Sequence, residues 1–309
     1  MGRLPAFALS LLATGLVVGL AALSLASASL AQTPTFRADV RLVRLLVTVK
    51  DSTGALVGSL SQDDFEVRDS GVPQTISVFE RTTSQPLSIS LLVDTSGSTA
   101  KDLKYETEAA GRFLRAITRE GNAQDSLSLY SFNHDVTQVA NFTRDAARIE
   151  RGLRSLSASA GTSLYDALLL SSERLESRDG RHVIIVISDG GDTTSATDYH
   201  GALRALHRAD AVLYPIVVIP ITSDAGRNIG GENALIQLAR STGGRAFFPG
   251  ISRLDDTFSE ILRDLRTQYL LAYYPKALPA APPRSFRTIE VKPKPPGLRA
   301  VSRGGYYEE

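Results

Sequence analysis

The segment His182–Ser188 (HVIIVIS) constrains the fold of this chain more than any other stretch of the sequence. It is short and almost continuously apolar. Such a run is typical of a strand that is covered on both faces, as in the middle of a parallel sheet. A sheet of this kind needs helices on each side, so the segment favours an α/β architecture.

Strand-like and helix-like segments alternate along the chain before and after this segment. Further strands are predicted at residues 87–93, 126–132, 136–142, 211–219 and 245–248. Helices are predicted from the residue-94 loop to about 119, and at 145–156, 164–175, 199–209, 233–242 and 255–266. In the first helix Ala109, Phe113 and Ile117 are spaced four apart and share one face. This order predicts a doubly wound, mainly parallel sheet within residues 87–267.

The segments at the two ends of the chain have the period of β-strands instead. Within residues 36–82, apolar side chains alternate with polar ones from Val43 to Lys50, and residues 268–309 contain further strands around a proline-rich stretch. Each segment offers too few strands to bury a core alone. We therefore expect them to form one small β-sandwich-like domain, interrupted in sequence by the α/β domain.

Residues 1–31 have the layout of a secretory signal peptide. Arg3 precedes an apolar run from Leu4 to Leu25, and small residues follow up to Ala31, where cleavage is expected. The run is nearly long enough to span a bilayer, so an uncleaved N-terminal anchor is the alternative. Either way the rest of the chain is predicted to be exported, to the periplasm, the cell envelope or the medium.

Charge and cysteine content exclude several classes of function. Lys and Arg total 34 and Asp and Glu total 33, a balance that argues against a nucleic-acid-binding protein. The chain has no cysteine, which excludes disulfides, zinc–thiolate sites and thiol nucleophiles.

Oxygen-bearing side chains follow the strands of the predicted sheet at three places. Asp94-Thr95-Ser96-Gly97-Ser98 comes directly after the first strand, Thr162 precedes a helix, and Asp189 follows the central strand. Ligands of open parallel sheets gather at the carboxyl ends of the strands, and hard cations such as Mg²⁺ prefer oxygen ligands. The first loop alone could equally be a turn that caps a helix. The three loops together predict a cation site.

These three loops resemble the metal-ion-dependent adhesion site of von Willebrand factor type A domains, over roughly residues 87–267. The resemblance implies that Ser96 and Ser98 bind the ion directly. It implies that Asp94, Thr162 and Asp189 bind it directly or through water. The ion is expected to be Mg²⁺, or another divalent cation such as Mn²⁺ or Ca²⁺. A partner macromolecule would supply an acidic side chain to the remaining coordination position.

The end segments resemble those of a bacterial exported subgroup of proteins related to von Willebrand factor type A domains. The resemblance lies in motifs such as Asp64-Phe65-Glu66-Val67 and Tyr269-Leu-Leu-Ala-Tyr273. It concerns architecture more than biological role.

The enzyme classes considered for this chain require residues that it does not have, and no catalytic residue is assigned. A phosphatase of the haloacid dehalogenase type requires a second Asp where this chain has Ser96, and a Walker A loop needs a Gly-Lys-Ser/Thr that does not occur. A serine hydrolase would need a Gly-x-Ser-x-Gly elbow, which does not surround Ser96. We therefore predict a non-enzymatic binding protein, active in adhesion, assembly or protein–protein interaction. The alternatives are a structural envelope protein in which the ion only stabilises the fold and, with less support, a Mg²⁺-dependent hydrolase.

Overall fold

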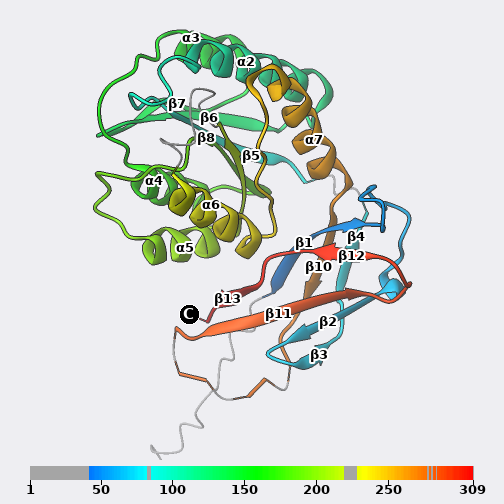
Figure 1. The fold of residues 1–309 in the computed structure, drawn as a ribbon. Coiled ribbons are helices and arrows are strands. Elements are labelled where there is room, and N and C mark those ends of the chain that lie inside the picture. Colours follow the sequence, from blue (N-terminus) through cyan, green and yellow to red (C-terminus); the bar gives the residue numbers. More distant parts are fainter. Residues whose placement is uncertain are drawn as a thin grey trace, which may run out of the picture. The chain divides into compact units, whose positions relative to one another are not determined.

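The α/β part of the chain is built on a five-stranded sheet with the order β7-β6-β5-β8-β9 (Figure 1). The computed structural model describes residues 42–81, 85–218, 228–276, 278–279, 281–282 and 284–308. The strands of this sheet are β5 (Leu87–Asp94), β6 (Ser126–Phe132), β7 (Val136–Thr143), β8 (Arg181–Ser188) and β9 (Ala211–Val217). Only the edge strand β7 is antiparallel to its neighbour. The predicted doubly wound, mainly parallel sheet is confirmed.

Helices cover both faces of this sheet (Figure 1). One face carries α2 (Leu103–Glu120), α3 (Ala146–Arg154) and α7 (Leu254–Thr267). The other carries α4 (Leu164–Glu176), α5 (Tyr199–Arg208) and α6 (Ile229–Ser241). Every residue of β8 is buried, because its side chains alternate between two apolar cores. This is the environment that the apolar run of residues 182–188 requires.

The end segments form two four-stranded antiparallel sheets, with the orders β12-β1-β10-β4 and β13-β11-β2-β3. Their strands are β1 (Val43–Lys50), β2 (Phe65–Asp69), β3 (Val72–Gln74), β4 (Val78–Glu80), β10 (Tyr269–Tyr273), β11 (Phe286–Pro293), β12 (Arg299–Val301) and β13 (Gly305–Tyr307). Strand β1 pairs with β10 and β12, and β2 pairs with β11, so the two ends of the chain share each sheet. The predicted fold class, an α/β domain plus a β-sandwich formed by both ends, is confirmed.

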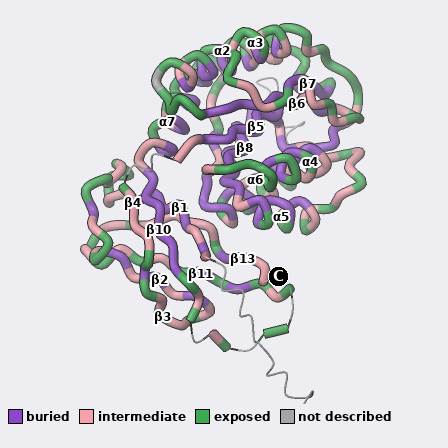
Figure 2. Tube along the Cα trace, turned by 180° about the vertical axis from the view of Figure 1, so that it is seen from behind, coloured by how far each residue is buried: buried purple, intermediate pink, exposed green. Residues whose placement is uncertain are grey.

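The two sheets of the sandwich enclose their own apolar core, which Figure 2 shows as buried stretches of β1 and β10. Alternate residues of β1 point into it, as the period of the sequence predicts. A buried carboxylate lies within this core. Oδ2 of Asp69 accepts hydrogen bonds from the phenols of Tyr273, at 2.8 Å, and Tyr306, at 2.9 Å. Asp69, a residue of the N-terminal segment, is thus hydrogen-bonded to two residues of the C-terminal segment.

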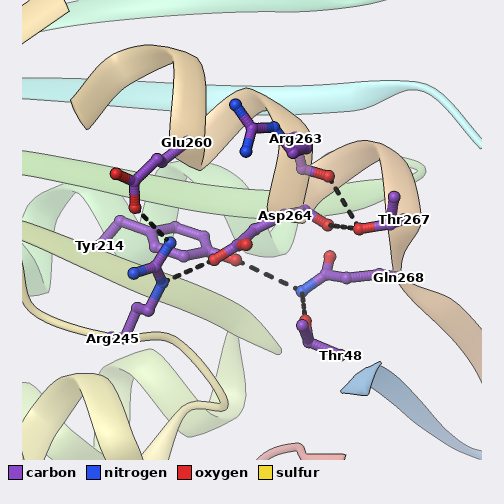
Figure 3. A network of polar contacts seen from close by, with 8 residues as sticks. All are labelled: Thr48, Tyr214, Arg245, Glu260, Arg263, Asp264, Thr267 and Gln268. Carbon is purple, nitrogen blue, oxygen red and sulfur yellow. Dashed lines mark hydrogen bonds and ion pairs between the residues drawn. The ribbon is translucent and has the colours of Figure 1, made fainter. Parts of the chain in front are cut away.

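A second polar network lies where α7 leads into β10 (Figure 3). Arg245 donates to Asp264 at 2.8 Å and to Glu260 at 3.0 Å, both on α7. The amide of Gln268 donates to the hydroxyls of Thr48, on β1, and Tyr214, on β9. Burial and the nearby carboxylate of Asp264 both raise the pKa of Tyr214. Hydrogen bonds therefore connect the end of α7 to β1 of the sandwich and to β9 of the five-stranded sheet.

The strand predicted at residues 245–248 is wrong. Phe247 makes a single parallel bridge with Ile216, in which its N–H donates to the carbonyl of Pro215 and its carbonyl accepts from Val217. Extending the ladder in one direction requires an N–H from Pro215, and extending it in the other requires one from Pro249. Proline has no N–H, so the pairing stops at one residue.

Other differences concern the ends of elements. The first helix begins at Leu103 and not directly at the Asp94 loop, and α6 begins at Ile229, before the predicted residue 233. Strand β13 was not predicted. The predicted signal peptide, residues 1–31, lies outside the described residues. None of the helices in the part of the chain that the structure describes is long and apolar enough to cross a membrane.

Candidate functional site

The first loop of the candidate site is folded around the carboxyl group of Asp94, the last residue of β5. Its Oδ1 accepts a hydrogen bond of 2.8 Å from the backbone N–H of Ser96, which turns the chain sharply after the strand. The hydroxyl of Thr99 donates to the carbonyls of Asp94 and Ser96 and closes the turn. The hydroxyl oxygens of Ser96 and Ser98 then lie 3.0 Å apart, close enough to face a single ligand.

Hydrogen bonds connect this loop to the other two. Ser159, in the loop that leads to Thr162, donates its N–H to the carbonyl of Thr95 at 2.8 Å. Ser188, at the end of β8, donates its hydroxyl to Oδ2 of Asp94 at 2.6 Å. The carboxyl ends of β5 and β8 are neighbours in the sheet, so all three loops meet at one edge.

Thr162 and Asp189 both lie close to Gly191. A Cβ atom added to this glycine would stand 3.1 Å from Oδ1 of Asp189 and 4.0 Å from the Thr162 hydroxyl oxygen. Oδ1 of Asp189 also accepts the N–H of Gly191 at 2.9 Å, which fixes the carboxylate. The structure thus brings the loops of all five predicted residues together. Their role in binding an ion stays a prediction.

The site has a buried floor and an open side. Asp94, Ser96 and Thr162 are buried, with 0%, 3% and 6% of their surface exposed. Ser98 is exposed and Asp189 is partly exposed. A ligand on this set of oxygens would therefore be reachable from solvent on the side of Ser98 and Asp189.

The electrostatics of the candidate site favour a positive ligand. Burial raises the pKa of Asp94 to about 6, and the charge of Asp189 acts in the same direction, against the hydrogen bonds from Ser188 and Ser96. Burial also raises the pKa of Glu106 to about 8, with further contributions from the charges of Asp94, Asp102 and Asp189. The charge of Asp189 thus disfavours the charged forms of Asp94 and Glu106, and that of Asp94 disfavours the charged form of Glu106.

The residues present fit a hard divalent cation. They offer two carboxylates and three hydroxyls, the oxygen ligands that Mg²⁺ accepts. Among the described residues no group of three or more His, Cys, Asp or Glu is arranged to hold a metal ion by itself. A cation here would therefore depend on the hydroxyls of Ser96, Ser98 and Thr162.

Sequence reasoning missed two residues of this region. Ser188 holds Asp94, and Glu106 is a fully buried carboxyl group on α2. A signal for Glu106 was present, because it stands three residues before Ala109 and so shares the apolar face of the helix. Asp192, in the loop that follows β8, accepts the N–H of Tyr165 at 3.1 Å and helps to position the start of α4.

Comparison with known proteins finds a match to one family within the α/β part. Residues 89–191 match the family model described as the von Willebrand factor type A domain. None of the curated proteins compared with the sequence matches it.

Solved structures of bacterial proteins have a similar fold. BatB from Bacteroides thetaiotaomicron is 17% identical, with a TM-score of 0.47, over 59% of this chain and 100% of that one. The von Willebrand factor domain of the type V pili tip protein Mfa5 from Porphyromonas gingivalis is 14% identical, with a TM-score of 0.47, over 59% and 95%. The pilus adhesin SpaC from Lactobacillus rhamnosus is 10% identical, with a TM-score of 0.50, over 80% and 47%. At these identities the likeness concerns the fold alone.

Proposed function

Because this chain carries a von Willebrand factor type A domain, we propose that it is an exported binding protein that engages an acidic side chain of a partner macromolecule through a divalent cation. Domains of this type mediate protein–protein interactions. The proposed ligands are Asp94, Ser96, Ser98, Thr162 and Asp189, and the proposed ion is Mg²⁺ or another divalent cation such as Mn²⁺ or Ca²⁺.

One observation carries the proposal. The oxygen-bearing loops meet at a single sheet edge, on a floor of buried groups with one side open to solvent. When bound, the cation would supply a positive charge with a coordination position free for an outside ligand. Three of the five proposed ligands are neutral hydroxyls, which leaves room for one more anionic oxygen. The exposure of Ser98 supports a binding role over an ion that only stabilises the fold.

Mg²⁺ is expected to raise the melting temperature of the exported fragment by about 5 °C at a concentration near 100 times its Kd. A ligand that binds only the native state stabilises that state by mass action. Asp94→Ala is expected to abolish the rise. Differential scanning calorimetry with and without Mg²⁺ measures both effects.

The control for this experiment is Asp94→Asn, which keeps the shape of the side chain and an oxygen for the Ser96 N–H. It is expected to fold and to lose most of the Mg²⁺ response. A full response to Mg²⁺ in Asp94→Ala would contradict the assignment of the site.

Binding of the partner is expected to depend on the same ion. EDTA should release the partner from the native envelope protein, and Thr162→Ala or Ser98→Ala should weaken the complex at least about tenfold, because each removes an oxygen ligand. Pull-down from envelope extracts with and without chelator, followed by titration of the recovered partner, measures this. A complex that keeps its affinity in EDTA would show that recognition occurs elsewhere.

A further inference from the structure

Glu106 is a buried acidic residue on the inner face of α2. None of its surface is exposed, and neither of its carboxyl oxygens has a hydrogen-bond partner among the residues that the structure describes. Burying a carboxyl group without a partner costs free energy. Its place on the inner face of α2, three residues before Ala109, would ordinarily belong to an apolar side chain. A residue that costs stability at a core position calls for another explanation.

The surroundings of Glu106 point to the candidate cation site. The N–H of Glu106 donates to the carbonyl of Asp102 at 3.0 Å, and the N–H of Asp102 donates to the carbonyl of Thr99 at 2.9 Å. The hydroxyl of Thr99 in turn donates to the carbonyl of Asp94, so Glu106 lies on the turn of α2 that follows the Asp94 loop. Of the charged groups that act on its carboxyl, Asp94 has the largest effect, and Asp189 also contributes. These are the two carboxylates of the proposed ligand set. In a buried, weakly polarisable region, like charges repel strongly, and a nearby cation would relieve that repulsion for all three groups.

We propose that Glu106 belongs to the cation site as an outer carboxylate, which strengthens binding of the ion without touching it. The outer position agrees with the absence, in the described part of the chain, of a three-acid ligand group that would include Glu106, Asp94 and Asp189. The inference rests on the proposed function, because it assumes that the site binds a cation. A buried group also cannot meet the partner, so its effect falls on the ion.

This role has a consequence for recognition. A third negative charge behind the ion holds it more firmly, but it also reduces the ion's attraction for the carboxylate of a partner. Glu106 therefore raises the affinity of the site for its cation when no partner is bound, and lowers the attraction of the bound cation for a partner.

The alternative is that Glu106 serves only the fold, as an acidic residue in the first turn of α2 that interacts with the helix dipole. The two roles predict opposite effects on the cation-free protein. If Glu106 supports the helix, its removal lowers the melting temperature without cation. If it belongs to the cation site, its replacement removes the cost of burying a carboxyl group without a partner and leaves that temperature unchanged or higher.

The test compares Glu106→Gln and Glu106→Leu with the wild-type exported chain, with no partner present. Isothermal titration with MgCl₂ is expected to give a Kd at least about tenfold weaker in both variants, the size of effect seen when outer groups of metal sites are removed. Calorimetry in EDTA is expected to give an unchanged or higher melting temperature. Glu108→Gln, the same charge change at an exposed position on the same helix, should leave both values unchanged.

A Mg²⁺ affinity within about twofold of the wild type in both variants would overturn the inference. So would a weaker affinity accompanied by a lower melting temperature in EDTA for both variants, which is the pattern of a purely structural residue. The proposed function fails separately, if the wild-type chain shows no response to Mg²⁺, Mn²⁺ or Ca²⁺.

Discussion

A chain that ends at Gln268 is expected to lose the fold of residues 42–81 completely, while the five-stranded sheet and its cation response persist. The truncation removes β10, which lies between β1 and β4, and β11, which pairs with β2. The remaining short strands would lose their partners and most of the cover for their apolar side chains. The cut keeps Gln268 because its side-chain oxygen accepts a hydrogen bond from the buried Arg181.

Limited proteolysis with mass spectrometry measures this effect, since an unfolded segment is cleaved at once. The five-stranded sheet takes no strand from either end segment, so it should stay protected and respond to Mg²⁺. A chain that ends at Gly297 is the graded control, because it loses only β12 and β13 and should retain partial protection of residues 42–81. If residues 42–81 of the shorter chain resist protease as in the full chain, the shared sandwich is not required for their fold.

Replacing Asp69 with alanine is expected to destabilise the sandwich by about 3 kcal/mol. The substitution removes the acceptor of two phenol hydrogen bonds within the core and leaves the hydroxyl of Tyr273, a fully buried residue, without this partner. Hydrogen bonds to a charged group contribute about 1.5–3 kcal/mol each. Urea denaturation, followed by the near-UV signal of the tyrosines, measures the change.

Single changes of the phenols separate the contributions to this network. Tyr273→Phe and Tyr306→Phe should each cost about 1–2 kcal/mol, and together less than the sum if they share one acceptor. Tyr307→Phe, which removes the neighbouring hydroxyl that does not bond to Asp69, is the control and should be nearly neutral. If Asp69→Ala costs no more than Tyr307→Phe, the carboxylate does not join the two segments energetically.

The sequence predicts the elements in which the burial of the side chains follows one regular pattern along the whole element. β8 is apolar throughout because both of its faces are covered, and the alternation in β1 reflects one buried and one partly exposed face. The single bridge at Phe247 was missed because it depends on which residue of β9 stands opposite. Two prolines end the pairing there, and one of them lies some thirty residues away in sequence.

The candidate site could be predicted in part for the same reason. Its proposed ligand residues lie in local motifs, Asp94 to Ser98 being one of them, and strand order places those motifs on one edge. Ser188 and Glu106 act across elements, so their roles depend on packing between β5, β8 and α2. The local sequence pattern shows that Glu106 is on the inner face of the helix, but it does not show which charged groups lie near its carboxyl group.

The pairing of β1 has a consequence for the moment at which the protein can fold. Both neighbours of β1 come from beyond residue 268, so the sheet cannot form while the ribosome is still synthesising the α/β part. Long-range pairing of this kind is slow, and an unpaired strand is exposed to wrong partners in the meantime.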